Sequence, residues 1–194
     1  MLVFGSRLLG APVMSLHTGA QLARLAKPLV DPSNLYVVAY EIEGDLLAEH
    51  PSFLPTRDIR KYGRYGMLIN SNDDIVGLED IIKIKSLHEL NFSLVGLTGI
   101  DQHKHKLGKV NDYSIDMSSF VIQQLDVKRG VFKSITDTGL LINRSQILEI
   151  NNTQVIVRSP HVKAAEPIMN SVRKEFVNPF RSTAPTSSTK DLQQ

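Results

Sequence analysis

Cysteine is absent from this 194-residue chain, so disulfides, zinc ribbons, iron–sulfur clusters and thiol nucleophiles are all excluded. No stretch approaches the roughly 20 consecutive apolar residues that a membrane-spanning helix needs. A strong excess of either charge is also lacking, because 22 basic and 20 acidic residues give a formal net charge of +2. A total this close to neutral does not indicate a protein that coats nucleic acid.

Targeting and catalytic signals are lacking as well. Residues 1–10 are apolar but interrupted by Arg7, and they lack the ordered regions of a secretory signal, so we expect a cytoplasmic protein. The chain has no Walker loop, dinucleotide-binding glycine fingerprint, nucleophile elbow or zincin helix. No two carboxylates can be placed facing each other across a cleft. We therefore expect a protein that is not an enzyme and that binds no cofactor or metal.

Short apolar runs, separated by Gly, Pro, Asn and Asp, are the dominant pattern that the chain does contain. These runs are residues 12–16, 35–42, 66–69, 92–97, 120–127 and 153–157. Strands of this length with frequent turn signals predict an all-β domain of the barrel or sandwich kind.

Residues 78–90 carry the one helical pattern in the middle of the chain. Leu78, Ile81, Ile82 and Leu87 fall near one face of such a helix, although the alternation of Ile82 with Ile84 fits a strand equally well. The segment is therefore expected to be either helical or extended.

Apolar positions also recur in a way that indicates an internal duplication. Residues 16–19 align with residues 97–99, and residues 30–38 align with residues 115–123. In a third block the apolar residues match at a constant offset, with Leu54, Ile59, Tyr62, Met67 and Ile69 over Ile142, Ile147, Ile150, Val155 and Val157. Three blocks in the same order predict two tandem copies of one unit.

The second copy resembles a PRC-barrel domain in residues 95–100, in the lysine- and glycine-containing stretch 106–116 and in residues 120–122. In the first copy, residues 53–59 are similar to the family's recurrent isoleucine–proline stretch. This copy departs from the family pattern, with Ala23 where the second copy has Gly108 and with Pro28 in the expected turn. The resemblance implies an all-β chain of two tandem small PRC-type β-barrels.

Five segments follow from the repeat and the composition. They are a first barrel at residues 4–77, a short helical or extended linker at 78–91, a second barrel at 92–159, a short C-terminal helix at 160–180 and a disordered tail at 181–194. The helix would carry an apolar face that either packs back on a barrel or binds a partner, made of Ile168, Met169, Val172 and Phe176.

The family resemblance implies a docking role. PRC barrels occur in the cytoplasmic part of a photosynthetic reaction-centre subunit, in a ribosome-maturation factor and in an archaeal cell-division protein. This chain lacks the transmembrane helix of the first and the separate N-terminal domain of the second, so only the module carries over. We expect a non-enzymatic adaptor or assembly protein that holds a protein partner, with the partner's identity and homo-oligomerisation left open.

The most basic stretch consists of Arg57, Arg60, Lys61 and Arg64, with Tyr62 and Tyr65 among them. Interleaved basic and aromatic residues can bind phosphates and stack bases, which makes RNA or the ribosome the alternative partner. The competing interpretation is a short helical turn whose Ile59 and Tyr62 face the core while the bases face water.

Two further groups have competing interpretations. His103 and His105 could chelate a metal if they share one face of a strand, with Asp101 or His88 as a third ligand, but the neighbouring lysines oppose a cation and favour a solvated hairpin tip. Asp112 and Asp116 are expected to accept hydrogen bonds from local backbone amides at strand ends.

Overall fold

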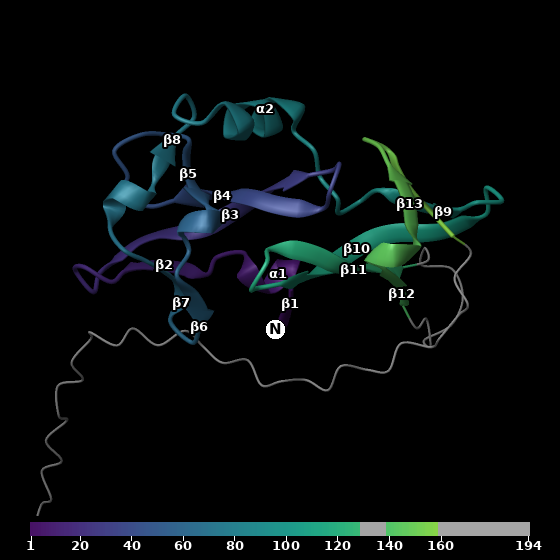
Figure 1. The fold of residues 1–194 in the computed structure, drawn as a ribbon, viewed down its shortest axis with the longest axis horizontal. Helices are drawn as coiled ribbons and strands as arrows, with labels where there is room; N and C mark the ends of the chain where they lie inside the picture. Colours follow the sequence, from purple (N-terminus) through teal and green to yellow (C-terminus); the bar gives the residue numbers. More distant parts are fainter. Residues whose placement is uncertain (129–138, 159–194) are drawn as a thin grey trace, which may run out of the picture.

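A computed structural model describes residues 1–128 and 139–158 of the chain, and within them the fold is mostly β (Figure 1). The paired strands form one sheet whose path runs from β13 (Ile147–Ile150) to β6 (Lys61–Gly63) without closing on itself. The predicted all-β class is confirmed at this level, while two closed barrels remain a prediction. The expected C-terminal helix with Ile168, Met169, Val172 and Phe176, and the tail after it, lie outside the described residues.

The first half of the sheet contains six strands, and the two longest of them form an antiparallel pair. In addition to β6, they are β2 (Pro12–Ser15), β3 (Gln21–Asp31), β4 (Tyr36–Glu43), β5 (Ser52–Pro55) and β7 (Gly66–Ile69), with the 3-10 helix η1 (Thr56–Asp58) between β5 and β6. Strand β2 pairs antiparallel with β3 and parallel with β7, whereas β3–β4, β4–β5 and β6–β7 are antiparallel pairs.

The second half repeats this order of pairing. In addition to β13, its strands are β9 (Thr98–Asp101), β10 (Lys106–Asp116), β11 (Val121–Lys128), β12 (Leu140–Asn143) and β14 (Gln154–Val157), with the 3-10 helix η3 (Arg144–Gln146) before β13. Strand β9 pairs antiparallel with β10 and parallel with β14, and β10–β11, β11–β12 and β13–β14 are antiparallel. The long strands also match in length, with 11 residues in β3 and β10 and 8 in β4 and β11.

Short elements connect the two halves. Strand β1 (Leu2–Phe4) pairs with β10 of the second half, although it lies at the start of the chain, and the short helix α1 (Gly5–Leu8) follows it. After the first half come the 3-10 helix η2 (Asn72–Asp74), the strand β8 (Val76–Gly77), which pairs with β5, and the helix α2 (Ile82–Leu90). In Figure 1, α1 lies between the two halves and α2 lies over β3 and β4.

Helix α2 covers one face of the first half. Its Ile84 and Leu87 are buried in a small apolar cluster with side chains from β3, β4 and β5. Ile82 is 85% exposed, so its predicted place on the apolar face was wrong. The reason is that the helix begins at Ile82, and residues 84 and 87, three apart, turn toward the sheet instead.

Three expectations about strands and turns were also wrong. Residues 92–97 form no strand, because β9 begins only at Thr98. Residues 16–19 lie in the turn after β2, so the first block of the sequence alignment was misplaced: β9 corresponds to β2, in which residues 12–15 pair with β3 and β7. Pro28 lies inside β3, in register with Tyr40 of β4, and not in a turn.

The halves meet where β4 lies beside β11. Tyr36 and Val121 are in register there, the Val37 amide donates to the Phe120 carbonyl at 2.9 Å, and the Ile122 amide donates to the Leu35 carbonyl at 2.9 Å. One apolar core cluster contains buried side chains from both halves. The two halves are therefore packed as one body around a shared core.

Candidate functional site

The four basic residues predicted from the sequence lie together at the β6 end of the sheet. We call Arg57, Arg60, Lys61 and Arg64 the basic surface. Arg57 belongs to η1, Lys61 to β6 and Arg64 to the turn before β7, and all four side chains are exposed. Helix η1 is held in place by Thr56, whose buried hydroxyl donates to a carbonyl of β4 at 2.8 Å.

Local contacts hold three of these side chains along the edge. The Arg57 Nε lies 3.5 Å from the Asp58 carboxylate, and the Arg60 Nε donates to the Asn70 side-chain oxygen at 3.1 Å. The Arg64 guanidinium lies 4.5 Å from the centroid of the Tyr65 ring, within the range of a cation–π contact. The guanidinium groups are therefore oriented by neighbours and still exposed.

The inward-facing residues of this stretch agree with the second sequence interpretation, while binding of an anionic partner remains a prediction. Ile59 and Tyr62 are partly buried and pack against the shared core, as expected for a turn with an inward apolar side. Burial raises the pKa of Tyr62, and the positive charge of Arg7 on α1 opposes this shift.

The second half offers a comparison at the equivalent place. Helix η3 and strands β13 and β14 repeat the order of η1, β6 and β7. The alignment of the third block sets the basic residues Arg57, Arg60, Lys61 and Arg64 over Ser145, Leu148, Glu149 and Asn152. The same local fold therefore forms without any of the four bases.

The two histidines do not share a strand face. His103 and His105 are exposed in the turn between β9 and β10, where Lys104 has a φ of 66° and reverses the chain. Asp101 organises the turn, since one carboxylate oxygen accepts the amides of His103 and His105 at 2.8 Å each, and the other lies 3.1 Å from the His105 Nδ1. Among residues 1–128 and 139–158, no three His, Cys, Asp or Glu side chains are grouped so that they could hold a metal.

Asp101 is expected to make stability depend on acid. Partial burial acts to raise its pKa, but the hydrogen bonds from His105 and His103 outweigh this and hold the pKa at about 2, below the ordinary 3.8. A depressed carboxyl pKa stabilises the fold above the unfolded value, and this stabilisation is lost as pH falls from about 4 toward 2. We expect Asp101→Asn to flatten the decline of the melting temperature over that window.

The measurement is thermal unfolding as a function of pH for the wild type and Asp101→Asn. The exposed Asp45 serves as the control, and Asp45→Asn should follow the wild-type acid profile. Parallel profiles for Asp101→Asn and the wild type would show that this carboxylate has no such role.

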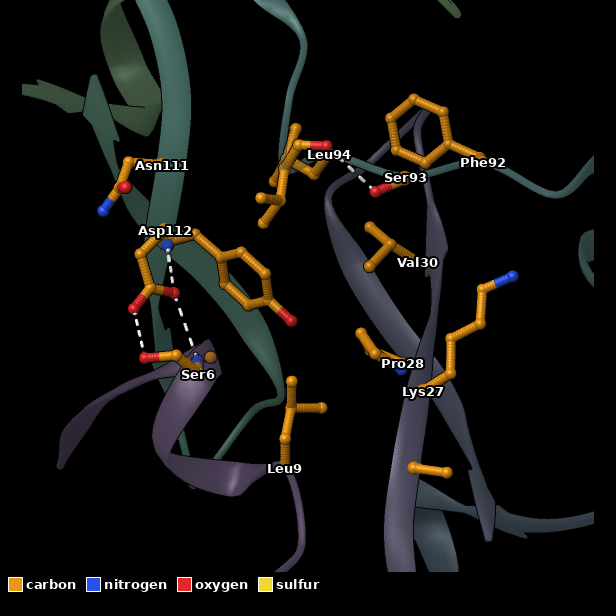
Figure 2. A pocket seen from close by; sticks show the side chains of 14 residues that line it. Ser6, Leu9, Lys27, Pro28, Val30, Phe92, Ser93, Leu94, Asn111 and Asp112 are labelled. Carbon is orange, nitrogen blue, oxygen red and sulfur yellow. Dashed lines mark hydrogen bonds between the residues drawn. The ribbon is translucent and has the colours of Figure 1, made fainter. Parts of the chain in front are cut away.

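A pocket of about 280 Å³ opens between the two halves (Figure 2), and we call it the junction pocket. Its walls come from α1, from the middle of β3 and β10, and from the chain before β9. It is lined by Gly5, Ser6, Leu9, Ala26, Lys27, Pro28, Val30, Phe92, Ser93, Leu94, Val95, Asn111, Asp112 and Tyr113.

Asp112 ties α1 to β10 at this pocket. One carboxylate oxygen accepts the Ser6 amide at 3.1 Å and the other accepts the Ser6 hydroxyl (Figure 2). The expectation that Asp112 sits at a strand end was wrong, because it lies inside β10 and its partner on α1 is remote in sequence, although it also accepts the adjacent Tyr113 amide at 2.8 Å. Asp116 does lie at the end of β10 and accepts the Ser118 amide at 3.3 Å, as expected.

Two comparisons of this chain with known proteins gave no match. No protein-family model matches it, and no curated protein matches it either. No helix in residues 1–128 and 139–158 is long and apolar enough to cross a membrane. The PRC-barrel resemblance therefore remains a prediction, and function has to be inferred from the geometry of the molecule.

Proposed function

We propose that this chain is a non-enzymatic adaptor or assembly protein that docks a protein partner through the basic surface. The observation that carries the proposal is the contrast between the two halves. At equivalent positions the second half folds with Ser145, Leu148, Glu149 and Asn152, so local folding does not account for the bases. An exposed row of cations is complementary to a partner surface rich in carboxylates.

We also propose that each half is a PRC-type barrel, as the sequence resemblance implies. The repeated order of paired strands and the equal lengths of the long strands support this interpretation. Docking is the role that the resemblance implies, and this part of the proposal rests on analogy.

RNA or the ribosome is the second candidate partner. The observation that favours it is the interleaving of Tyr62 and Tyr65 with the four bases. Stacking of bases needs an open ring, however, and Tyr62 packs against the core while Arg64 lies over the Tyr65 ring. Phosphate contacts alone would then remain, so the geometry favours a protein partner.

The test is mass spectrometry of what co-purifies with the tagged full chain, with and without nuclease. We expect a protein partner whose retention survives nuclease, weakens with added salt and falls about tenfold or more in Arg57→Ala/Arg60→Ala, since a tenfold loss corresponds to about 1.4 kcal/mol. Lys106→Ala/Lys109→Ala is the matched control, because it removes two exposed charges from β10 of the other half.

Two outcomes would count against the protein-docking proposal. Loss of all partners after nuclease would assign the surface to RNA. Equal retention by Arg57→Ala/Arg60→Ala and by the control would show that the basic surface is not the docking site.

A further inference from the structure

The junction pocket is built from equivalent positions of the two halves. Ala26, Lys27 and Pro28 are the sixth to eighth residues of β3, and Asn111, Asp112 and Tyr113 are the sixth to eighth residues of β10. Leu9 and Val95, 49% and 47% exposed, stand at the rim and precede Gly10 and Gly96, respectively. The pocket thus lies where the repeats face each other, and no single half could form it.

Nearly every polar side chain around the pocket has a partner within the protein. Asp112 binds Ser6, and the Lys27 ammonium donates to the Asn91 side-chain oxygen at 2.6 Å. The Ser93 hydroxyl donates to the Val95 carbonyl at 3.0 Å, and the Asn111 amide donates to Asp126 at 3.0 Å. Both charged groups near the opening therefore already have hydrogen-bond partners within the protein, and the apolar remainder of the lining favours a neutral occupant.

Tyr113 is the exception among these polar groups. Its side chain is only 4% exposed, and its hydroxyl makes no hydrogen bond to any residue in the described part of the chain. The hydroxyl end of the ring lies against Gly5, where a Cβ would come within 2.4 Å of the Tyr113 Cζ. Gly5 and Tyr113 both line the pocket. The Tyr113 hydroxyl is not among the fully buried polar atoms without a partner, so it lies at the wall, where an occupant can reach it.

The rest of the lining is apolar, and the volume limits the size of an occupant. Leu9, Pro28, Val30, Phe92 and Leu94 contribute hydrocarbon surface. A cavity of about 280 Å³ is larger than the roughly 150 Å³ that accommodates benzene and lies just below the ~300–1,000 Å³ of ligand pockets. One ring with one or two substituents fits these dimensions.

We propose that the junction pocket binds a small single-ring organic molecule whose one neutral hydroxyl or carbonyl oxygen hydrogen-bonds the Tyr113 hydroxyl. The apolar walls hold the ring, and the oxygen pairs with an accessible hydroxyl that has no hydrogen-bond partner in the described part of the chain. Pro28 occupies the position equivalent to Tyr113 and offers no donor, so the ligand binds in one orientation. This site is separate from the basic surface and does not depend on the docking proposal.

The probes are p-cresol and toluene, which differ by one hydroxyl, titrated into the full chain by ligand-observed NMR. We expect p-cresol to bind about 2–10-fold more tightly than toluene, the range that one net hydrogen bond gives. In Tyr113→Phe this ratio should fall to about one while toluene binding is unchanged, which shows that the pocket itself is intact. Arg57→Ala/Arg60→Ala should bind both probes as the wild type does.

The second part of the experiment fills the pocket with a large side chain. Ala26→Trp, on the β3 wall, and Val95→Trp, at the exposed rim, should each abolish binding of both probes. Val95→Trp keeps the test open if Ala26→Trp fails to fold. The proposal is overturned if neither probe binds the wild type, if both filled variants fold and bind as the wild type does, or if Tyr113→Phe keeps the preference for p-cresol.

Discussion

Gly66→Ala is expected to lower the free energy of unfolding by more than about 2 kcal/mol, because a residue forced into a rarely populated backbone region costs about 1–3 kcal/mol and this one also clashes. Gly66 has a φ of +94°, and a Cβ there would lie 2.1 Å from the Pro12 carbonyl oxygen. That oxygen belongs to the backbone of β2, so it cannot move aside without disturbing the β2–β7 pairing.

Gly63→Ala is the matched control for this change. Gly63 lies directly across from Gly66 in the β6–β7 hairpin, and a Cβ at Gly63 would meet nothing within 4 Å. We expect a change within about 0.5 kcal/mol for Gly63→Ala, as for most surface substitutions. Urea unfolding followed by circular dichroism measures both variants, and an equal loss of stability in the two would show that the close approach of β2 and β7 is not as described.

Ile122→Ala is expected to cost about 2–5 kcal/mol, the usual range for truncating a buried isoleucine. Ile122 is fully buried in β11, and its amide donates to Leu35 of the first half. Because one core cluster contains side chains from both halves, we expect the loss to destabilise both halves together in a single cooperative transition.

The exposed Ile82 on α2 is the control for the same substitution. It is 85% exposed, so Ile82→Ala should leave stability nearly unchanged. Hydrogen exchange in urea should show the amides of β3 and β4 opening with those of β10 and β11 in Ile122→Ala. Two separate transitions, with the first half unaffected, would contradict a shared core.

The long strands could be predicted because their local composition, rich in β-branched and aromatic residues, is itself typical of buried strands. In residues 35–42 β-branched and aromatic side chains are dense, and β4 indeed runs over Tyr36–Glu43. The third repeat block was also correct, since Met67 and Val155 both lie in strands that run parallel to β2 and β9, respectively. The spacing of apolar residues therefore aligns the two copies correctly where both copies pack against the shared core.

Other features depend on contacts between segments that are remote in sequence, and such contacts cannot be inferred from local sequence patterns. The segment 92–97 has strand-forming residues, but it packs at the junction and reaches a strand only at Thr98. Asp112 was expected to accept local amides at a strand end, because nothing in the local sequence indicates its partner Ser6, 106 positions away. The junction pocket could not be predicted for the same reason, since it exists only where the repeats meet.

The docking proposal is tested most directly by placing a photo-crosslinking amino acid at Lys61 in the full chain and, in a second version, at the equivalent Glu149. After irradiation in lysate and nuclease treatment, we predict a discrete protein adduct from position 61 that disappears in high salt, and none from position 149. The same adducts from both positions, or adducts from position 61 that contain only RNA, would contradict docking of a protein partner at the basic surface.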